Sequence, residues 1–207
     1  MEKFVKLTAL ACPIAEPNLN TDQILPARYL KRTRAMGFGT ALFHDLRFDA
    51  EGHEKVDFPI NRPEWREAGV LVCAHNFGCG SSREAAVYAL HDFGIRCVIG
   101  PSFGDIFSGN AAQNGLLTAT VTDEEAAEIR SALNGRPTLP LTINLEQQTI
   151  VCGNRLYTFT IDPARRLRLL NGWDDVALTE SYKDGISAFK ATDRSKRPWA
   201  VPRPAHE

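Results

Sequence analysis

The stretch that decides the fold runs Val70-Leu71-Val72-Cys73-Ala74-His75-Asn76-Phe77-Gly78-Cys79-Gly80-Ser81-Ser82-Arg83-Glu84. Its first five residues are apolar, as is typical of a short buried strand. Beyond the two glycines the apolar period changes to i, i+3, i+4 and i+7, which is the period of a helix, in Ala86, Ala89, Leu90 and Phe93. The sequence therefore predicts a strand, a glycine loop and the start of a helix.

This glycine loop is suited to holding an anion. A helix start presents unpaired backbone N–H groups and the positive end of the dipole, and glycines let a ligand approach the backbone. Ser81 and Ser82 add two hydroxyls, and Arg83 adds a planar fork of donors that matches a carboxylate. A simpler interpretation needs no ligand: Ser81 caps the helix, and Glu84, three residues later, completes a capping box. Both interpretations can hold together.

Other motif interpretations of the loop differ in how well they fit. A dinucleotide fingerprint requires glycine where Arg83 stands, and a Walker loop requires a Gly-Lys-Ser/Thr ending, so neither matches. Cys79 at the tip of the turn remains a candidate nucleophile, with His75 or His91 as a nearby base. An independent thiol enzyme is therefore one alternative function.

Strands alternate with helices around the loop. The sequence predicts a strand over 96–100, a helix that opens at 101–103 and ends at 114–115, a strand over 116–121, and a helix from a capping box at 122–125 to 133. Such alternation favours an α/β fold with a parallel sheet, in which ligands bind at the carboxyl ends of the strands.

The two ends of the chain have other patterns. An N-terminal strand is expected over 4–10, and short alternating runs over 141–161 predict an antiparallel meander. Asp162-Pro163 is expected to cap a helix, and a second helix follows Trp173. Between them, residues 35–66 are rich in turn residues and predict an irregular excursion that faces a partner.

Length and composition set the broad class. The 207 residues carry a net charge of −1, which gives no support to nucleic acid or an anionic membrane as a partner. The N-terminus lacks the apolar core of a signal peptide and no window has the length of a membrane span, so we expect a soluble cytoplasmic protein. We expect one domain over 1–193 and a loosely ordered tail over 194–207.

The five cysteines are scattered and odd in number, which favours reduced thiols: Cys12, Cys73, Cys79, Cys97 and Cys152. They form no Cys-x-x-Cys pair and no cluster with histidine. The sequence therefore predicts no metal site and no cofactor in this chain.

Several motifs, in this order along the chain, resemble the small subunit of 3-isopropylmalate dehydratase, the swivel domain of the aconitase superfamily. The central one is Asn76-Phe77-Gly78-Cys79-Gly80-Ser81-Ser82-Arg83-Glu84. The others are Asn20-Thr21-Asp22-Gln23-Ile24-Leu25-Pro26-Ala27-Arg28-Tyr29-Leu30-Lys31, Phe43-His44-Asp45-Leu46-Arg47-Phe48, Pro101-Ser102-Phe103-Gly104-Asp105-Ile106-Phe107, Asn114-Gly115-Leu116-Leu117 and Leu169-Leu170-Asn171-Gly172-Trp173-Asp174-Asp175.

The resemblance implies a swivelling β/β/α domain with a parallel-sheet core, flanking helices and a C-terminal antiparallel meander. It also implies a hydro-lyase of leucine biosynthesis that converts 2-isopropylmalate to 3-isopropylmalate by dehydration and rehydration. In such enzymes a [4Fe–4S] cluster with one open iron acts on the hydroxyl, and its cysteines belong to a large subunit. The implied partner is therefore that large subunit, and the substrate is a small dicarboxylate.

The resemblance also implies roles for particular residues. Ser81 is implied as the catalytic base in its alkoxide form, with Ser82 and Arg83 binding a substrate carboxylate. Asp22 is implied at the edge of the site, although from the sequence alone it could equally be a cap or turn residue. The segment that contains Leu30, Lys31 and Arg32 is implied to reach the variable group of the substrate, although basic runs are commonly solvated surface.

One departure from the family pattern concerns substrate identity. The family continues with histidine after Ser-Ser-Arg-Glu, where this chain has Ala85. This leaves open a related hydro-lyase for another substituted malate, such as dimethylmalate or methylmalate and citraconate. A non-catalytic relative that only binds diacids is a further alternative.

Overall fold

The computed structural model describes residues 1–81 and 83–200. The strands are β1 (Lys6–Ile14), β2 (Val70–Cys73), β3 (Cys97–Gly100), β4 (Leu117–Thr120), β5 (Pro140–Asn144), β6 (Thr149–Cys152) and β7 (Arg155–Thr158). The helices are α1 (Thr21–Ile24), α2 (His44–Arg47), α3 (Glu84–Phe93), α4 (Asp105–Gln113), α5 (Asp123–Gly135), α6 (Pro163–Asn171), α7 (Asp175–Ser181) and α8 (Lys183–Lys196). Short 3-10 turns lie at Ala27–Lys31, Arg34–Met36, Gly39–Ala41, Pro59–Asn61 and Pro198–Ala200.

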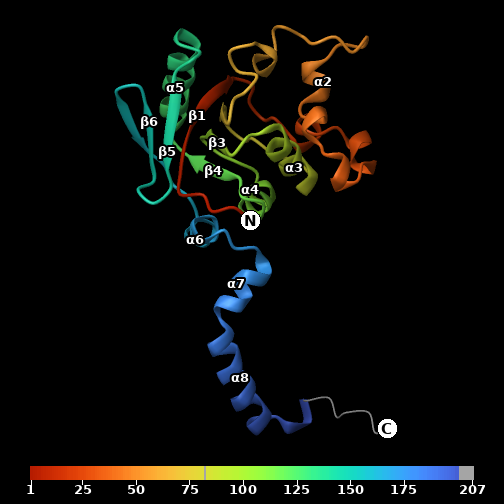
Figure 1. The fold of residues 1–207 in the computed structure, drawn as a ribbon, viewed down its shortest axis with the longest axis vertical. Coiled ribbons are helices and arrows are strands. Elements are labelled where there is room, and N and C mark those ends of the chain that lie inside the picture. The colour runs from red at the N-terminus through yellow and green to blue at the C-terminus, as the bar shows by residue number, and fades with distance from the viewer. Residues whose placement is uncertain (82, 201–207) are drawn as a thin grey trace. The chain divides into compact units, whose positions relative to one another are not determined.

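The strands form one seven-stranded sheet in the order β4-β3-β2-β1-β5-β6-β7 (Figure 1). Strands β1 to β4 pair in parallel, and β5, β6 and β7 continue the sheet as the antiparallel meander. Both halves of the predicted α/β architecture are confirmed. Strand β1 is longer than predicted and joins the two halves, because Ala11–Ile14 pair with β2 while Lys6–Leu10 pair with β5.

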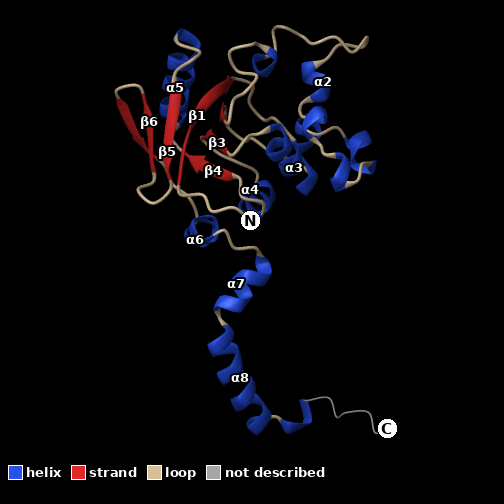
Figure 2. Cartoon of the chain, in the orientation of Figure 1, coloured by secondary structure: helices blue, strands red, loops and turns tan. Residues whose placement is uncertain are grey.

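Alternate residues of the central strands enter two different cores. In β2, Leu71 and Cys73 belong to the cluster that contains α3 and α4, whereas Val70 and Val72 belong to the cluster that contains α5. Both faces of the parallel strands are buried, which explains their continuous apolar runs. Helices therefore lie on both faces of the sheet (Figure 2).

The ends of α4, α5 and α6 agree with the sequence signals at three points and differ at a fourth. Helix α5 begins with the predicted capping box of Thr122 and Glu125, and α6 begins with Asp162 as its cap before Pro163. Helix α4 ends before Asn114 as predicted, but it begins at Asp105 rather than at 101–103. Ser102 and Gly104 instead form backbone hydrogen bonds with Phe77 in the glycine loop.

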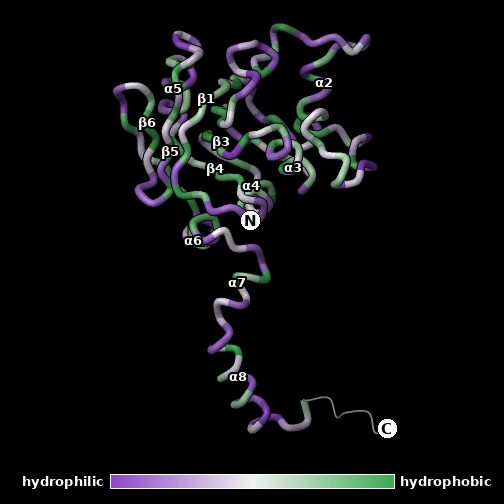
Figure 3. The backbone as a smooth tube through the Cα atoms, viewed as in Figure 1, coloured by the Kyte–Doolittle hydropathy of each residue, from purple (hydrophilic) through white to green (hydrophobic). Residues whose placement is uncertain are grey.

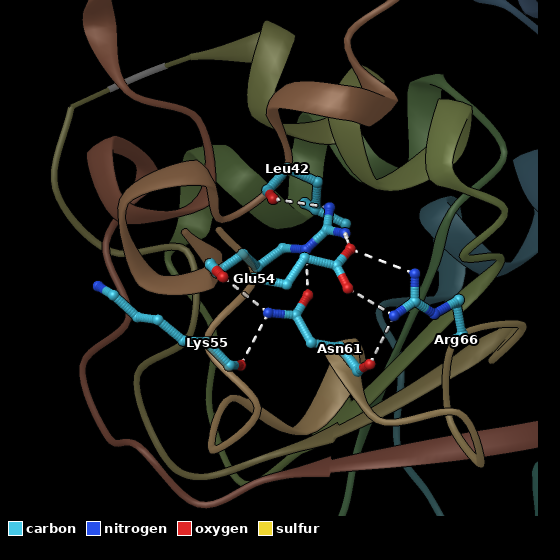
Figure 4. A network of polar contacts seen from close by, with 6 residues as sticks. Leu42, Glu54, Lys55, Asn61 and Arg66 are labelled. Atoms are coloured by element: carbon cyan, nitrogen blue, oxygen red, sulfur yellow. Dashed lines mark hydrogen bonds and ion pairs between the residues drawn. The ribbon is translucent and has the colours of Figure 1, made fainter. Parts of the chain in front are cut away.

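The excursion over 35–66 is irregular, as predicted, and a buried arginine organises it (Figure 4). The Arg47 Nε donates to the Asn61 side-chain oxygen at 2.9 Å, and its Nη2 lies 3.8 Å from Glu54. The Asn61 amide nitrogen donates to the carbonyls of Arg47 and Lys55, and Arg66 completes the network through Glu54 and the Asn61 carbonyl. Burial lowers the pKa of Arg47. The network holds four separate parts of the excursion together.

Asn61→Ala should destabilise the chain because it removes three hydrogen bonds and leaves the buried Arg47 Nε without its acceptor. We expect the free energy of unfolding to fall by about 2–4 kcal/mol, in the range for a group left unpaired in a buried network. Urea denaturation measures the change. Asn154→Ala, at an exposed turn, is the matched control and should change it by less than about 0.5 kcal/mol. Equal effects of both substitutions would contradict the proposed importance of the network.

Of the described residues, 173–200 belong to a second compact unit, and Met1–Gly172 form the first. Hydrophobic and hydrophilic segments alternate along α7 and α8 (Figure 3), and Val176, Tyr182 and Phe189 are exposed. Helix α8 continues past the expected boundary at 193 to Lys196, and the end of the expected tail, 201–207, lies outside the described residues. The single domain over 1–193 stays a prediction.

No helix in the described part of the chain has the length and apolarity needed to cross a membrane.

Candidate active site

Three loops meet at the carboxyl ends of β1, β2 and β3. The glycine loop that follows β2 lies in the middle, bonded on one side to residues 18–21 and on the other to residues 102–104. The Gly78 N–H donates to the Leu19 carbonyl at 2.7 Å, and the Phe77 N–H donates to the Ser102 carbonyl at 3.1 Å. This confirms that the loop lies at the edge of the sheet where ligands of parallel α/β folds bind.

The loop is anchored in the core by Phe77, which is buried. Its ring packs edge-on against Phe107 at 5.4 Å and against Phe43 at 6.5 Å between ring centroids. Gly78, next in the chain, has a φ of +72° and leaves no room for a side chain, since a Cβ there would lie 2.3 Å from the Phe107 ring. The sharp turn of the loop therefore depends on glycine at this position.

Gly78→Ala should displace the glycine loop from its position against Phe107. The strained φ and the collision with the buried Phe107 ring together should lower the free energy of unfolding by about 1–3 kcal/mol. Gly109→Ala, inside α4, is the matched control because a Cβ there meets nothing within 4 Å; it should be neutral or stabilising. Thermal unfolding of both variants decides, and a Gly78→Ala chain as stable as wild type would refute the steric argument.

The capping box predicted for Ser81 and Glu84 is wrong. Helix α3 begins at Glu84, with Arg83 as its N-cap residue, and no side chain caps it among the described residues. The Glu84 carboxylate instead accepts a hydrogen bond from the Asn114 amide at 2.9 Å, at the end of α4. Glu84 can reach Asn114 because α3 and α4 pack against each other. A local sequence motif contains no information about this packing. Ser81 is therefore free of the structural role that the simpler interpretation gave it.

Arg83 and Asp22 form an ion pair. The Arg83 side chain is only 16% exposed, and its buried Nη1 contacts the Asp22 carboxylate without making a hydrogen bond to any described residue. The Asp22 side chain is 53% exposed. Asp22 is not the cap or turn residue of its segment, since Asn20 caps α1 in a capping box with Gln23. A largely buried arginine whose Nη1 lacks a hydrogen bond among the described residues is suited to a carboxylate ligand.

Ser81 itself is exposed, on the same stretch as Arg83. Its carbonyl accepts a 2.7 Å hydrogen bond from the Thr21 hydroxyl. Ser82, the other predicted hydroxyl, lies outside the described residues. The structure thus brings Ser81, Arg83 and Asp22 together. Thr21 was missed as a site residue because it is separated from Ser81 by 60 positions, and only its place beside Asp22 in the motif pointed to it.

Most of the basic segment is engaged within the chain. Arg28 pairs with Asp45, whose pKa is held at about 2 by that guanidinium, and Arg34 pairs with Asp92 on α3. Arg32 donates to the Thr40 hydroxyl at 3.0 Å. Leu30 and Lys31 are exposed in the 3-10 turn Ala27–Lys31. These two are therefore the predicted specificity residues whose side chains face solvent, whereas the Arg32 guanidinium is already bonded.

The geometry around Cys79 does not favour an independent thiol enzyme. Its Sγ donates to the Asn18 carbonyl at 3.4 Å, and no contact with an imidazole is found in the described residues. His91 is near the end of α3, in a separate hollow with Arg96, while Cys79 is in the loop before α3 begins.

No group of three or more potential metal ligands from histidine, cysteine, aspartate and glutamate is found within residues 1–81 and 83–200. Four of the five cysteines are buried in different strands, and burial raises the pKa of each thiol: Cys12, Cys73, Cys97 and Cys152. The described residues thus do not fit an iron–sulfur cluster, whose ligands are thiolates.

Comparison with known proteins agrees with this geometry. The family model "Aconitase C-terminal domain" matches residues 1–124. A 3-isopropylmalate dehydratase small subunit from Rhodospirillum centenum is 44% identical over 97% of this chain and 100% of its own length, and one from Afipia carboxidovorans is 45% identical over 96% and 100%. The crystal structure of a 3-isopropylmalate dehydratase from Methanocaldococcus jannaschii matches with a TM-score of 0.66 and 25% identity, covering 88% of this chain and 98% of that one.

The sheet order and the glycine loop at its carboxyl edge define an aconitase-type α/β domain. Within that class, near-complete alignment at 44% identity is decisive. The chain belongs to the family of 3-isopropylmalate dehydratase small subunits.

Proposed function

We propose that this chain is the small subunit of a hydro-lyase that isomerises 2-isopropylmalate to 3-isopropylmalate in leucine biosynthesis. The observation that carries the proposal is the largely buried Arg83, paired with an exposed aspartate and two positions after an exposed serine at the carboxyl edge of the sheet. The names of the relatives favour isopropylmalate over other substituted malates.

In this proposal Arg83 binds a carboxylate of the substrate. A substrate carboxylate can take the place of Asp22 as the partner of Arg83, because the aspartate side chain is half in water while the guanidinium is largely buried. Ser82 contributes a hydroxyl to the same carboxylate, and Asp22 stays in the polar surroundings of the bound diacid. Leu30 and Lys31 contact the variable substituent, and Arg32 holds their turn in place through Thr40.

Ser81 takes the proton from the carbon next to a carboxylate. Its side chain precedes α3 by three residues, so the positive end of that helix and the Arg83 charge both favour an anionic oxygen there. The same groups bind the substrate and stabilise the base, which keeps the acidic carbon close to Ser81.

For the second half of the reaction, departure of the hydroxyl, the part of the chain that the structure describes offers no group of metal ligands. We infer that a large subunit contributes a [4Fe–4S] cluster, which supplies a Lewis acid for the hydroxyl when bound. The active site is then complete only where the two chains meet, and this chain alone has no activity.

Anaerobic reconstitution with the large subunit encoded in the same genome tests the proposal. Hydration of isopropylmalate is followed through the absorbance of the alkene diacid. We expect turnover with both chains and none with either chain alone. Absence of turnover in a complex that has formed and holds an intact cluster would reject isopropylmalate as the substrate. Activity of this chain alone would reject the dependence on a partner.

A further inference from the structure

The glycine loop lies along the first turn of α1, and three contacts join them at alternate loop residues. The Thr21 N–H donates to the Cys79 carbonyl at 3.0 Å, the Thr21 hydroxyl donates to the Ser81 carbonyl at 2.7 Å, and the Asp22 carboxylate pairs with Arg83. One turn of helix therefore holds both the proposed base and the proposed carboxylate ligand.

The Thr21 hydroxyl is not needed by its own helix. Asn20 caps α1, since its side-chain oxygen accepts from the Gln23 N–H at 2.9 Å and the Gln23 side chain accepts from the Asn20 N–H at 2.9 Å. Thr21 is only 2% exposed, and its branched side chain has few rotamers in a helix. Its hydroxyl is thus a rigid, buried donor directed at a residue 60 positions away.

We propose that Thr21 is a positioning residue for the reaction, which acts by holding the Ser81 carbonyl so that the Ser81 side chain keeps its place beside Arg83. This inference rests on the proposed role of Ser81. In the described residues the Thr21 bond is the contact that fixes the Ser81 peptide, and the Ser81 side chain is otherwise exposed to solvent. A base must lie within hydrogen-bond reach of its proton, so small displacements of this peptide reduce the rate.

Two substitutions separate the hydroxyl from the shape of the side chain. Thr21→Val keeps the branched shape and removes the donor, and Thr21→Ser keeps the donor. Thr8→Val is the matched control, because the Thr8 hydroxyl bonds Thr142 at 2.9 Å between β1 and β5, in the meander half of the sheet. Melting temperatures of all three variants identify any that fail to fold.

The first measurement uses the full chain alone. Backbone order parameters of Cys79, Gly80, Ser81 and Arg83, from NMR relaxation, should fall in Thr21→Val and stay at the wild-type values in Thr21→Ser and Thr8→Val. Unchanged order in Thr21→Val would overturn the proposal, whatever the activity of the enzyme.

The second measurement uses the complex with the large subunit. Thr21→Val should lower kcat by about tenfold to hundredfold with KM changed by less than about twofold, and Thr21→Ser should restore most of the rate. A normal kcat in Thr21→Val, or the same loss in Thr21→Ser, would overturn the positioning role. An inactive wild-type complex, or a Ser81→Ala complex as active as wild type, would instead overturn the proposed function and the catalytic part of this inference with it. The order parameters would still decide whether Thr21 anchors the loop.

Discussion

Ser81→Ala should lower kcat of the reconstituted enzyme by about 10³, with KM for isopropylmalate close to the wild-type value. Proton abstraction by a positioned base contributes about 10²–10⁴ in rate, and a factor of 10³ corresponds to about 4 kcal/mol of barrier. KM should change little because the substituted side chain is the exposed Ser81, while Arg83, the proposed carboxylate ligand, is retained. The fold should be unaffected, since Ser81 does not cap α3 and its carbonyl still accepts from Thr21.

Initial rates across a range of isopropylmalate concentrations, together with melting temperatures, measure this effect. Ser131→Ala in α5 is the matched control and should leave kcat and KM unchanged. Helix α5 packs on the face of the sheet opposite to α3 and α4. A Ser81→Ala enzyme that keeps more than about a tenth of the wild-type kcat would remove Ser81 from the role of base. If Cys79→Ala abolished activity while Ser81→Ala did not, the result would favour the alternative of an independent thiol enzyme.

Much of the fold could be predicted because its signals are local. The apolar runs of β2 and β3, the capping box at Thr122 and the Asp162-Pro163 start of α6 each depend on neighbours within a few positions. The order of the strands and the role of β1 in joining the parallel and antiparallel halves depend on pairing between distant segments, which periodicity does not encode.

The site followed the same division. The glycine loop at a strand end was predictable, because a strand-to-helix change across glycines is a local pattern. The absence of the capping box was not predictable, because Glu84 at the start of α3 accepts a hydrogen bond from Asn114 at the end of α4. The hydrogen bond from Arg32 to Thr40, which engages the guanidinium, and the bond from Thr21 to Ser81 are likewise tertiary contacts. Local motifs name the chemical groups, and packing decides which of them remain available to a ligand.

Arg83→Lys should raise KM and lower kcat/KM by about a hundredfold, although the positive charge is kept. Lysine is a point charge without the fork that binds a carboxylate through two parallel bonds, and its shorter reach changes the pair with Asp22. The corresponding loss of transition-state stabilisation is about 2.7 kcal/mol. The loss should be equal for 2-isopropylmalate and for a malate with a smaller substituent, because both present the same carboxylate to Arg83.

Steady-state kinetics with both substrates measure this, and Arg155→Lys is the matched control, an exposed arginine paired with Glu128 on α5 that should leave KM unchanged. Leu30→Ala gives the complementary result: as a contact of the variable group it should change the ratio of kcat/KM between the two substrates while Arg83→Lys does not. If Arg83→Lys altered that ratio, the guanidinium would contact the substituent rather than the common carboxylate. If it altered neither KM nor kcat, the ion pair with Asp22 would be structural, and the carboxylate would bind elsewhere on the loop.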